Sequence, residues 1–199
     1  FDAWVGDDHD AQVAHDTARH LKSLVEAGTP VYFMHGNRDF MLAARYAAQS
    51  GMTLLADPVR IDLYGVPTLL MHGDTLCTDD TAYQTFRRRV RHPLTQALLR
   101  RLPLALRHRL ARQARAGSEA AKAGKPAEIM DVNAEAVVRV LRERQVSRLI
   151  HGHTHRPARH VHPVDGQDRE RWVVPDWYAR WGYVACDGAG CALRVEDLG

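Results

Sequence analysis

Short apolar runs, each followed directly by a polar motif, recur along this chain and predict buried strands. Three such runs are residues 31–34 (VYFM), 66–72 (VPTLLMH) and 146–150 (VSRLI). Continuous β-branched and aliphatic residues over these lengths are typical of strands buried on both faces. Between the runs, apolar residues return with a helical period. The pattern therefore predicts an α/β fold.

Capping residues predict where the helices begin and end. Asp10 is a candidate cap for a helix over residues 11–26, which Gly28 closes. Asp39 is a candidate cap for the next helix, which stops at Gly51.

Three further features complete the predicted element order. Residues 59–64 and 66–72 read as two strands joined at Gly65, and a helix is expected near residues 131–144. The remaining carboxyl-terminal segment alternates apolar and polar residues between glycine-rich turns. It predicts an antiparallel β finish.

The polar motifs at the ends of the predicted strands suggest one shared site. They are residues 35–39 (HGNRD), 72–74 (HGD) and 151–155 (HGHTH). In α/β folds, ligands collect at the carboxyl ends of the strands. A His-x-His pair in an extended segment would also place both imidazoles on one face. Taken singly, HGNRD is better explained as a turn and HGD as a strand end with a helix cap, whereas the three histidines of HGHTH favour a metal over an exposed basic turn. Together the three motifs favour a metal site.

The residue types in these motifs indicate the metal and the reaction. Imidazole, amide and carboxylate groups without thiolate suit Mn, Fe or Zn rather than a cysteine-rich structural zinc site. A two-metal centre fits hydrolysis of a phosphate ester or anhydride. Arg38 could hold phosphate oxygens as a bidentate donor.

Basic charge is concentrated in one segment. Between Thr81 and Ser118 there are ten arginines and no acidic residue, whereas the whole chain has a net charge of only +3. Pro93 and Pro103 divide residues 80–116 into three predicted helices. Apolar residues recur there in steps of four, at Phe86, Val90, Leu94, Leu98, Leu102, Leu106 and Leu110. From the residues alone, three readings of the segment are open: a helical cap whose apolar side chains pack on the domain, a lid for a lipid, and a nucleic-acid-binding surface, for which it has few aromatic residues.

Cysteine usage and the lack of long apolar runs suggest a cytosolic protein. The three cysteines match no metal or redox spacing, so three reduced thiols are expected. No apolar run approaches the roughly 20 residues needed to span a bilayer. No signal peptide is visible.

The motifs carry a family resemblance. Asn37 in GNRD, His72 in MHGD and the GHTH of residues 152–155 resemble calcineurin-like metallophosphoesterases. HGNRDF, MHGDTLCTDD, IMDVN and LIHGHTHRP narrow this to the UDP-2,3-diacylglucosamine pyrophosphatase (LpxH) family of lipid A biosynthesis. The likeness runs from Phe1 to about Pro157 and continues more loosely to the end. Arg38 supports the narrower assignment, because the wider superfamily usually has histidine there.

The resemblance implies a fold, a reaction and a set of site residues. The fold would be the calcineurin-like sandwich, as a single domain over residues 1–199 with a helical lid at about 80–125. The family cleaves the pyrophosphate of UDP-2,3-diacylglucosamine to UMP and lipid X, by attack of water on the phosphorus nearer the nucleoside, with two Mn²⁺ ions. The implied metal ligands are Asn37, His72, His153 and His155, and the implied catalytic residues are Asn37, Arg38 and His153. Substrate contacts are implied for Asn37, Arg38, Asp80, Ser118, Lys122, Lys125 and His153.

One departure from the family pattern affects the metal site. The family begins with strands that end in Asp-x-His and Gly-Asp, which supply the remaining ligands, and neither motif is present here. The first β-α unit is therefore expected to be missing, and the 199 residues alone are expected to bind metal weakly and to have little activity. The full protein would be a monomer that acts at the cytoplasmic face of the inner membrane of a Gram-negative bacterium and does not bind nucleic acid. A generic phosphoesterase and a non-catalytic basic membrane module remain the alternatives.

Overall fold

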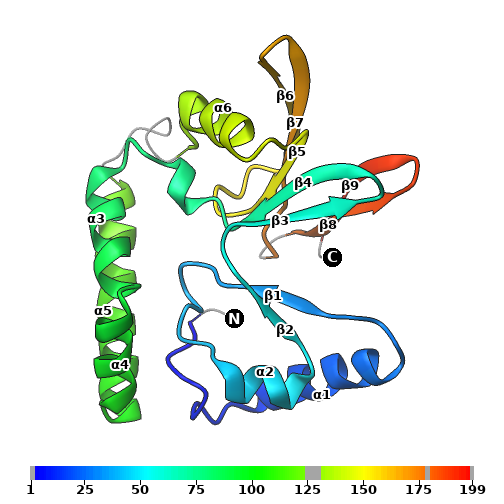
Figure 1. Ribbon diagram of the computed structural model, residues 1–199. Coiled ribbons are helices and arrows are strands. Elements are labelled where there is room, and N and C mark those ends of the chain that lie inside the picture. Colours follow the sequence, from blue (N-terminus) through cyan, green and yellow to red (C-terminus); the bar gives the residue numbers. More distant parts are fainter. Residues whose placement is uncertain (1–2, 124–130, 178–179, 198–199) are drawn as a thin grey trace. The chain divides into compact units, whose positions relative to one another are not determined.

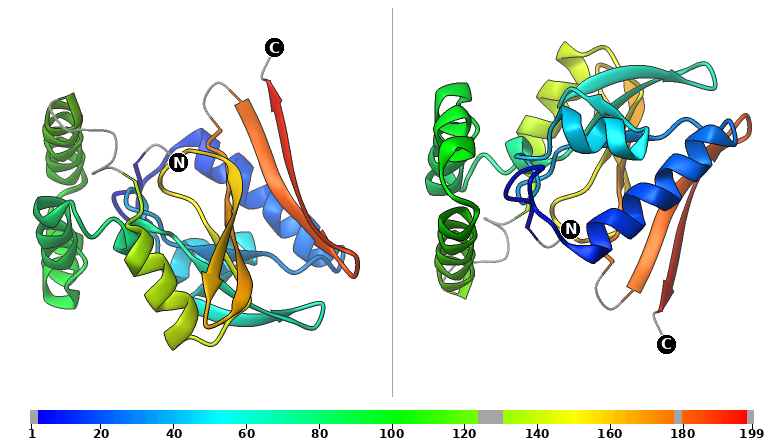
Figure 2. Two further views of the ribbon diagram at one scale, coloured as in Figure 1. Left: turned by 90° about the horizontal axis from the view of Figure 1, so that it is seen from above. Right: turned by 90° about the horizontal axis from the view of Figure 1, so that it is seen from below.

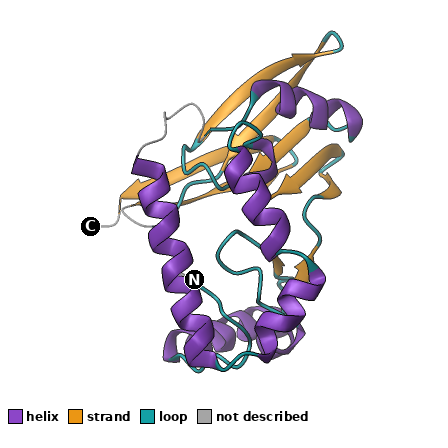
Figure 3. Cartoon of the chain, turned by 90° about the vertical axis from the view of Figure 1, so that its left-hand side faces the viewer, coloured by secondary structure: helices purple, strands orange, loops and turns teal. Residues whose placement is uncertain are grey.

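The computed structural model describes residues 3–123, 131–177 and 180–197, and the chain forms two compact units. Unit 1 comprises Phe1–Ala56 and Thr81–Lys125, and unit 2 comprises Asp57–Asp80 and Pro126–Gly199. Helices make up most of unit 1 and strands most of unit 2, as the purple and orange segments of Figure 3 show.

Unit 1 contains a small β-α-β motif and the helices of the predicted lid. Its elements are α1 Gln12–Glu26, β1 Tyr32–Met34, α2 Ala44–Ser50, β2 Thr53–Leu55, α3 Thr81–Val90, α4 Pro93–Arg101 and α5 Leu104–Ala123. The strands β1 and β2 form a two-stranded parallel sheet in which Phe33 pairs with Leu54. The sequence pattern predicted β1 but not the three-residue strand β2.

Helices α1 and α2 pack on one another, as the views in Figure 2 show. Tyr46 is 3% exposed and donates a hydrogen bond from its hydroxyl to the Ala14 carbonyl oxygen at 2.9 Å. The Trp4 ring lies 4.4 Å from the Tyr46 ring, centre to centre, in the same core cluster. Burying an aromatic side chain contributes roughly 1.5–3 kcal/mol, so this contact anchors the amino-terminal segment to both helices.

Two predicted helix caps are wrong. Ala11, not Asp10, is the N-cap of α1, and Asp10 instead binds the His15 imidazole at 2.6 Å. Helix α2 begins at Ala44 rather than directly after Asp39, whose carboxylate accepts a hydrogen bond from the Gly36 backbone at 2.5 Å.

The carboxylate at the start of α2 comes from a distant residue. Asp7 accepts hydrogen bonds from the backbone N–H groups of Ala43 and Tyr46 at 2.9 and 3.0 Å. These are amides that a helix leaves unsatisfied at its N-terminus. Local capping patterns cannot reveal a cap 36 residues away. Gly51 closes α2 in the left-handed conformation, with φ 73°, as expected.

The prolines divide the lid as predicted. Pro93 stands in the first turn of α4, and α5 begins after Pro103. Helix α5 is longer than expected, because it continues through the polar segment to Ala123. Leu99 of α4 packs against the core of unit 1. Arg91 donates a hydrogen bond to the Gly36 carbonyl oxygen at 2.9 Å, so the lid is attached to the rest of unit 1 by both apolar and polar contacts.

Unit 2 is built on a five-stranded mixed sheet. Its elements are β3 Val59–Leu63, β4 Val66–Met71, the 3-10 helix η1 Asp74–Leu76, α6 Ala134–Glu143, β5 Arg148–His151, β6 Ala158–Val164, β7 Gln167–Val173, β8 Arg180–Asp187 and β9 Gly190–Asp197. The sheet order is β3-β4-β5-β7-β6, and β8 and β9 form a separate hairpin. The central strands β4, β5 and β7 are parallel, and β3 and β6 are antiparallel at the edges. The predicted antiparallel finish is correct for the hairpins and wrong for β7 against β5.

Helix α6 packs on this sheet, as Figure 1 shows. The Asn133 side chain caps the helix by accepting a hydrogen bond from the Ala136 N–H at 3.0 Å. Val137 and Leu141 are fully buried and share one core cluster with Leu149 of β5. This packing fixes the position of β5 and therefore of the HGHTH motif at its end.

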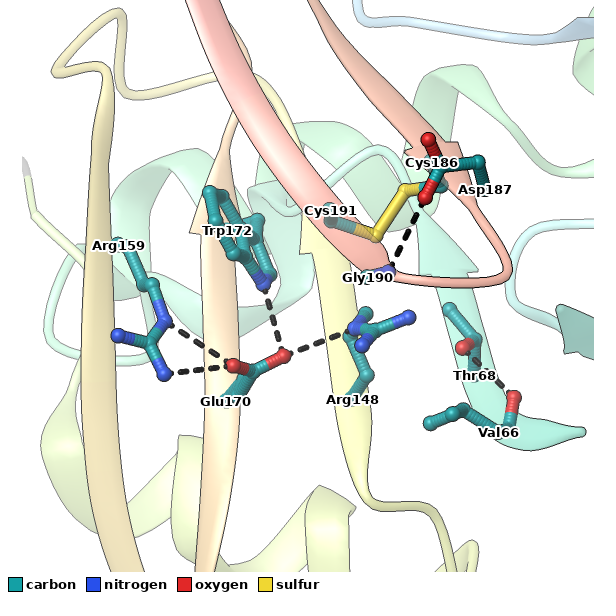
Figure 4. A network of polar contacts seen from close by, with 10 residues as sticks. All are labelled: Val66, Thr68, Arg148, Arg159, Glu170, Trp172, Cys186, Asp187, Gly190 and Cys191. Atoms are coloured by element: carbon teal, nitrogen blue, oxygen red, sulfur yellow. Dashed lines mark hydrogen bonds and ion pairs between the residues drawn. A yellow bond between two sulfur atoms is a disulfide. The ribbon is translucent and has the colours of Figure 1, made fainter. Parts of the chain in front are cut away.

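The expectation of three reduced thiols is wrong. Cys186 and Cys191 form a disulfide, drawn in Figure 4, and Cys77 lies outside it as a buried thiol. The two cysteines face one another across β8 and β9, with their Cα atoms 4.1 Å apart. Their separation of five residues in the sequence does not predict a disulfide unless the hairpin that joins β8 to β9 is known.

Candidate functional site

Two of the three polar motifs follow neighbouring strands of the sheet of unit 2. Met71 and His151 are register partners in the parallel strands β4 and β5, so both strands end at the same level. Beyond them, the Gly152 N–H donates a hydrogen bond to the His72 carbonyl oxygen at 3.0 Å. The position of both loops at one edge was predicted from the sequence and is confirmed.

This edge brings two imidazoles together. The rings of His72 and His153 are 5.0 Å apart, centre to centre, at 71° to one another. The His72 N–H donates a hydrogen bond to the Asp57 carboxylate at 3.1 Å. Asp57 thereby holds the backbone that carries one of the two rings.

Gly73 allows the two loops to approach closely. Its φ is 107°, a conformation that side chains disfavour. A Cβ atom at this position would lie 2.6 Å from the His151 Nδ1 and 3.1 Å from the Gly152 carbonyl oxygen. Glycine is therefore required here for both backbone conformation and space.

His153 and His155 do not lie on an extended segment, which corrects the expectation from their spacing. Both residues have positive φ, 69° and 56° respectively. Left-handed residues break the two-residue alternation of a strand, so the two side chains need not share a face. The His153 ring meets the His72 ring edge to face, whereas the Nδ1 of His155 lies 3.2 Å from the Asp176 carboxylate.

His151 lies behind this loop and is buried. Its Nδ1 donates a hydrogen bond to the Gly152 carbonyl oxygen at 2.8 Å, and its Nε2 accepts one from Arg171 at 3.2 Å. Burial lowers the pKa of His151 to about 4. The geometry fits a neutral imidazole that supports the loop.

The third motif belongs to unit 1, where it follows β1. Asn37 is exposed and Arg38 half-buried. The Arg38 carbonyl oxygen accepts a hydrogen bond from the Trp4 N–H at 2.8 Å, which fixes the loop from the amino-terminal side. Burial raises the pKa of Asp39, and the hydrogen bond from Gly36 opposes that rise.

The other predicted substrate residues are spread along the chain. Asp80 precedes α3 and is half-buried, Ser118 is exposed on α5, and Lys122 stands in the same helix. Lys125 lies outside the described residues. Among the residues that the structure describes, no three histidine, cysteine or acidic side chains gather as a metal site.

Three residues that contact the motifs were not predicted from the sequence. Asp57 binds the His72 backbone, Asp176 pairs with His155, and Arg171 binds His151. Asp57 precedes a proline and Asp176 follows one, so both read as ordinary turn residues. Arg171 stands in an alternating strand, and its burial depends on the strands on either side of β7.

The chain is similar to proteins of known families. Residues 1–157 match the family described as calcineurin-like phosphoesterase. A protein of Cellvibrio japonicus named UDP-2,3-diacylglucosamine hydrolase is 50% identical over 100% of this chain and 82% of its own length. Proteins of the same name from Enterobacter sp. (strain 638) and Pseudomonas aeruginosa are each 48% identical, over 97% and 100% of this chain and 80% and 79% of their own lengths.

Proposed function

Because the chain belongs to the calcineurin-like phosphoesterases and, among them, to the UDP-2,3-diacylglucosamine hydrolases, we propose that it hydrolyses the pyrophosphate of UDP-2,3-diacylglucosamine. Water would add to the phosphorus nearer the nucleoside, and the bond from that phosphorus to the bridging oxygen would break. The products are UMP and 2,3-diacylglucosamine 1-phosphate. The observation that carries this proposal is the pairing of His72 with His153 at the ends of β4 and β5. The chain that holds this pair is 50% identical to one of these hydrolases.

The family is metal-dependent, and the histidine pair fits metal coordination. Neutral imidazole nitrogen is a common ligand of transition-metal ions, so two adjacent rings can bind one ion. The rings of His72 and His153 are 5.0 Å apart. We propose that these residues, with His155 and Asn37, hold two Mn²⁺ ions. A divalent ion supplies an activated water and neutralises charge on the phosphoryl oxygens.

The protein's own residues would then bind and orient the substrate. We propose that Arg38 holds phosphoryl oxygens through its guanidinium, with Asn37 and His153 beside it. Asp80 and Ser118 are assigned to the substrate as well. Lys122 and Lys125 complete the proposed contacts from the end of the lid.

The lid is suited to a lipid substrate. Several of its apolar side chains remain exposed, notably Leu94 at 74% and Leu98 at 62%. No arginine is buried between Thr81 and Ser118 except Arg107. Among the described residues, no helix is long and apolar enough to cross a bilayer. We propose that the lid receives acyl chains and meets anionic head groups at the inner-membrane surface.

The proposal is tested with full-length protein, UDP-2,3-diacylglucosamine and Mn²⁺, by measuring UMP release. In water labelled with ¹⁸O, the label is expected in UMP rather than in the lipid phosphate. His72→Ala and His153→Ala are expected to lower the rate at least about 100-fold, and chelation of the metal should abolish it. His20→Ala, an exposed histidine on α1, is the matched control and should retain activity.

A generic phosphoesterase is the competing function, and the same preparations distinguish it. Failure to release UMP, combined with cleavage of simple nucleotide or phosphate esters, would replace the proposed substrate. Vesicle binding that survives His72→Ala and His153→Ala, with no hydrolysis of any ester, would instead support a non-catalytic membrane module.

A further inference from the structure

A cavity of about 400 Å³ opens in unit 2 beside the HGHTH loop. This volume lies within the range of about 300–1,000 Å³ typical of small-molecule sites. Six polar or charged residues line it: Asp131, Thr154, His155, Arg156, His160 and Arg171. It is formed within unit 2, and its lining includes His155 of the proposed metal ligands but neither His72 nor His153.

Arg171 is the most buried charged residue of this cavity, at 7% exposed. Its Nε donates a hydrogen bond to the His162 Nε2 at 3.2 Å, and its Nη1 lies 3.2 Å from the His151 Nε2. A ring nitrogen that accepts a hydrogen bond carries no proton, so both acceptors belong to neutral imidazoles. Neither of them therefore supplies a negative charge that would balance the charge of Arg171.

No carboxylate pairs with Arg171 in the parts of the chain that the structure describes. The nearby Asp131 is occupied by the Arg156 guanidinium at 2.6 Å and by the Val132 N–H at 2.7 Å. Asp131 acts on Arg171 only as a more distant charge. Burying a guanidinium without a contacting counter-ion costs free energy, which an anion in the cavity would offset.

Arg148 is a second buried arginine of the same sheet, and it is paired with a carboxylate. It is also 7% exposed, but its Nε lies 2.9 Å from the Glu170 carboxylate. Two arginines of equal burial on neighbouring strands thus differ in one respect, the contacting anion. That difference marks Arg171 as the residue arranged for a ligand.

Two further donors line the cavity. The Thr154 hydroxyl is buried without a hydrogen-bond partner in the described part of the chain. The His160 ring makes no hydrogen bond to any residue in the described ranges, and its centre lies 6.5 Å from that of the His162 ring. A guanidinium, a hydroxyl and an imidazole together suit an anion with several oxygens rather than a single carboxylate oxygen.

We propose that this cavity is a binding site for a phosphate monoester, held by Arg171 with Thr154 and His160. The choice of a phosphate monoester rests on the proposed function, because both products of that reaction carry one. Free phosphate offers the same chemistry. The sources are distinguished by comparing UMP, glucosamine 1-phosphate and inorganic phosphate.

The test is calorimetric titration of full-length, metal-free protein with each of these three compounds and with uridine. Without metal, phosphate cannot be bound through ions at the histidine pair. Saturable binding of at least one phosphate compound is expected, with uridine much weaker than UMP. Arg171→Met should raise the Kd at least about tenfold, whereas Arg148→Met, the matched buried arginine, should leave the Kd unchanged.

A second measurement on the unmodified protein guards against misfolding of the variants. Phosphate should shift the NMR signals of the Arg171 Nε–H and the His160 ring, and leave the Arg148 Nε–H in place. Absence of saturable binding, equal affinity for uridine and UMP, or unmoved Arg171 and His160 signals would overturn the proposal. Binding is read without turnover, so loss of the proposed hydrolase activity and loss of this site are separate results.

Discussion

The guanidinium of Arg107 binds the carboxylate of Asp8, although 99 residues separate them in the chain. Arg107 is 5% exposed and also donates a hydrogen bond to the Val5 carbonyl oxygen at 2.6 Å. The hydrogen bond to Arg107, opposed by burial, lowers the pKa of Asp8. This contact joins α5 of the lid to the amino-terminal segment of unit 1.

Replacing Arg107 should loosen the lid. Arg107→Met is expected to lower the free energy of unfolding by about 1–3 kcal/mol, because it leaves the Val5 carbonyl oxygen without its donor. Hydrogen exchange should rise in α5. Arg109→Met, an exposed arginine of the same helix, is the control. Equal exchange in both variants would show that Arg107 does not hold the helix.

The Glu170 carboxylate joins three strands of unit 2 and predicts a pH dependence of stability. Figure 4 shows it between Arg148 of β5, Arg159 of β6 and Trp172 of its own strand. Burial alone would raise the pKa of Glu170, but these hydrogen bonds outweigh it and lower the pKa from its usual value. A depressed pKa contributes stability above the unfolded-state value, and that contribution is lost as the pH falls through the folded-state value.

Glu170→Gln should therefore reduce stability near neutral pH, by about 1–3 kcal/mol. As the pH falls below the unfolded-state pKa of a glutamate, about 4.3, and through the lower folded-state value, the difference from the unmodified protein should shrink, because Glu170 becomes protonated. Urea unfolding at a series of pH values measures both effects. Glu135→Gln, in the first turn of α6, is the control. A stability difference that stays constant down to pH 3 would contradict this account.

Cys77 should be unreactive in the folded protein. It is 2% exposed, and burial, with neighbouring carboxylates including Asp131, raises its pKa to about 12. The thiolate is the reactive form, so almost none is present at pH 8. Alkylation of Cys77 by iodoacetamide is expected to require unfolding and to speed up sharply in urea. Rapid modification in native buffer would show that this part of unit 2 opens readily.

Exposed leucines of the lid should serve membrane binding rather than stability. Leu94→Ser and Leu98→Ser are expected to weaken binding to anionic vesicles several-fold and to raise the KM for the diacyl substrate, since each removes apolar area from the contact. The unfolding midpoint should change little. Val13→Ser, which alters a 65% exposed residue on α1, is the control and should leave both unchanged. Unaltered vesicle binding in the leucine variants would show that these exposed side chains do not bind the membrane.

The order of helices and strands followed largely from local pattern. Strands β1, β4 and β5 were predicted because each is a short apolar run, and Pro93 and Pro103 mark the divisions of the lid. The starts of the helices were less predictable. Helix α2 receives its capping carboxylate from Asp7, and no local rule connects that residue to Ala43.

The sequence by itself determined the family of this protein and the motifs at its strand ends. Motif residues and apolar runs are contiguous in the chain, so they can be recognised without knowing which distant residues meet. Tertiary structure decided which motif residues meet. Parallel pairing of β4 with β5 brings His72 to His153, and left-handed backbone at His155 turns that side chain toward Asp176. It also decided that Arg148 contacts a carboxylate, whereas Arg171, equally buried, contacts none among the residues that the structure describes. Burial and ion pairing depend on neighbouring strands far apart in the chain, and the alternation within a single strand does not record them.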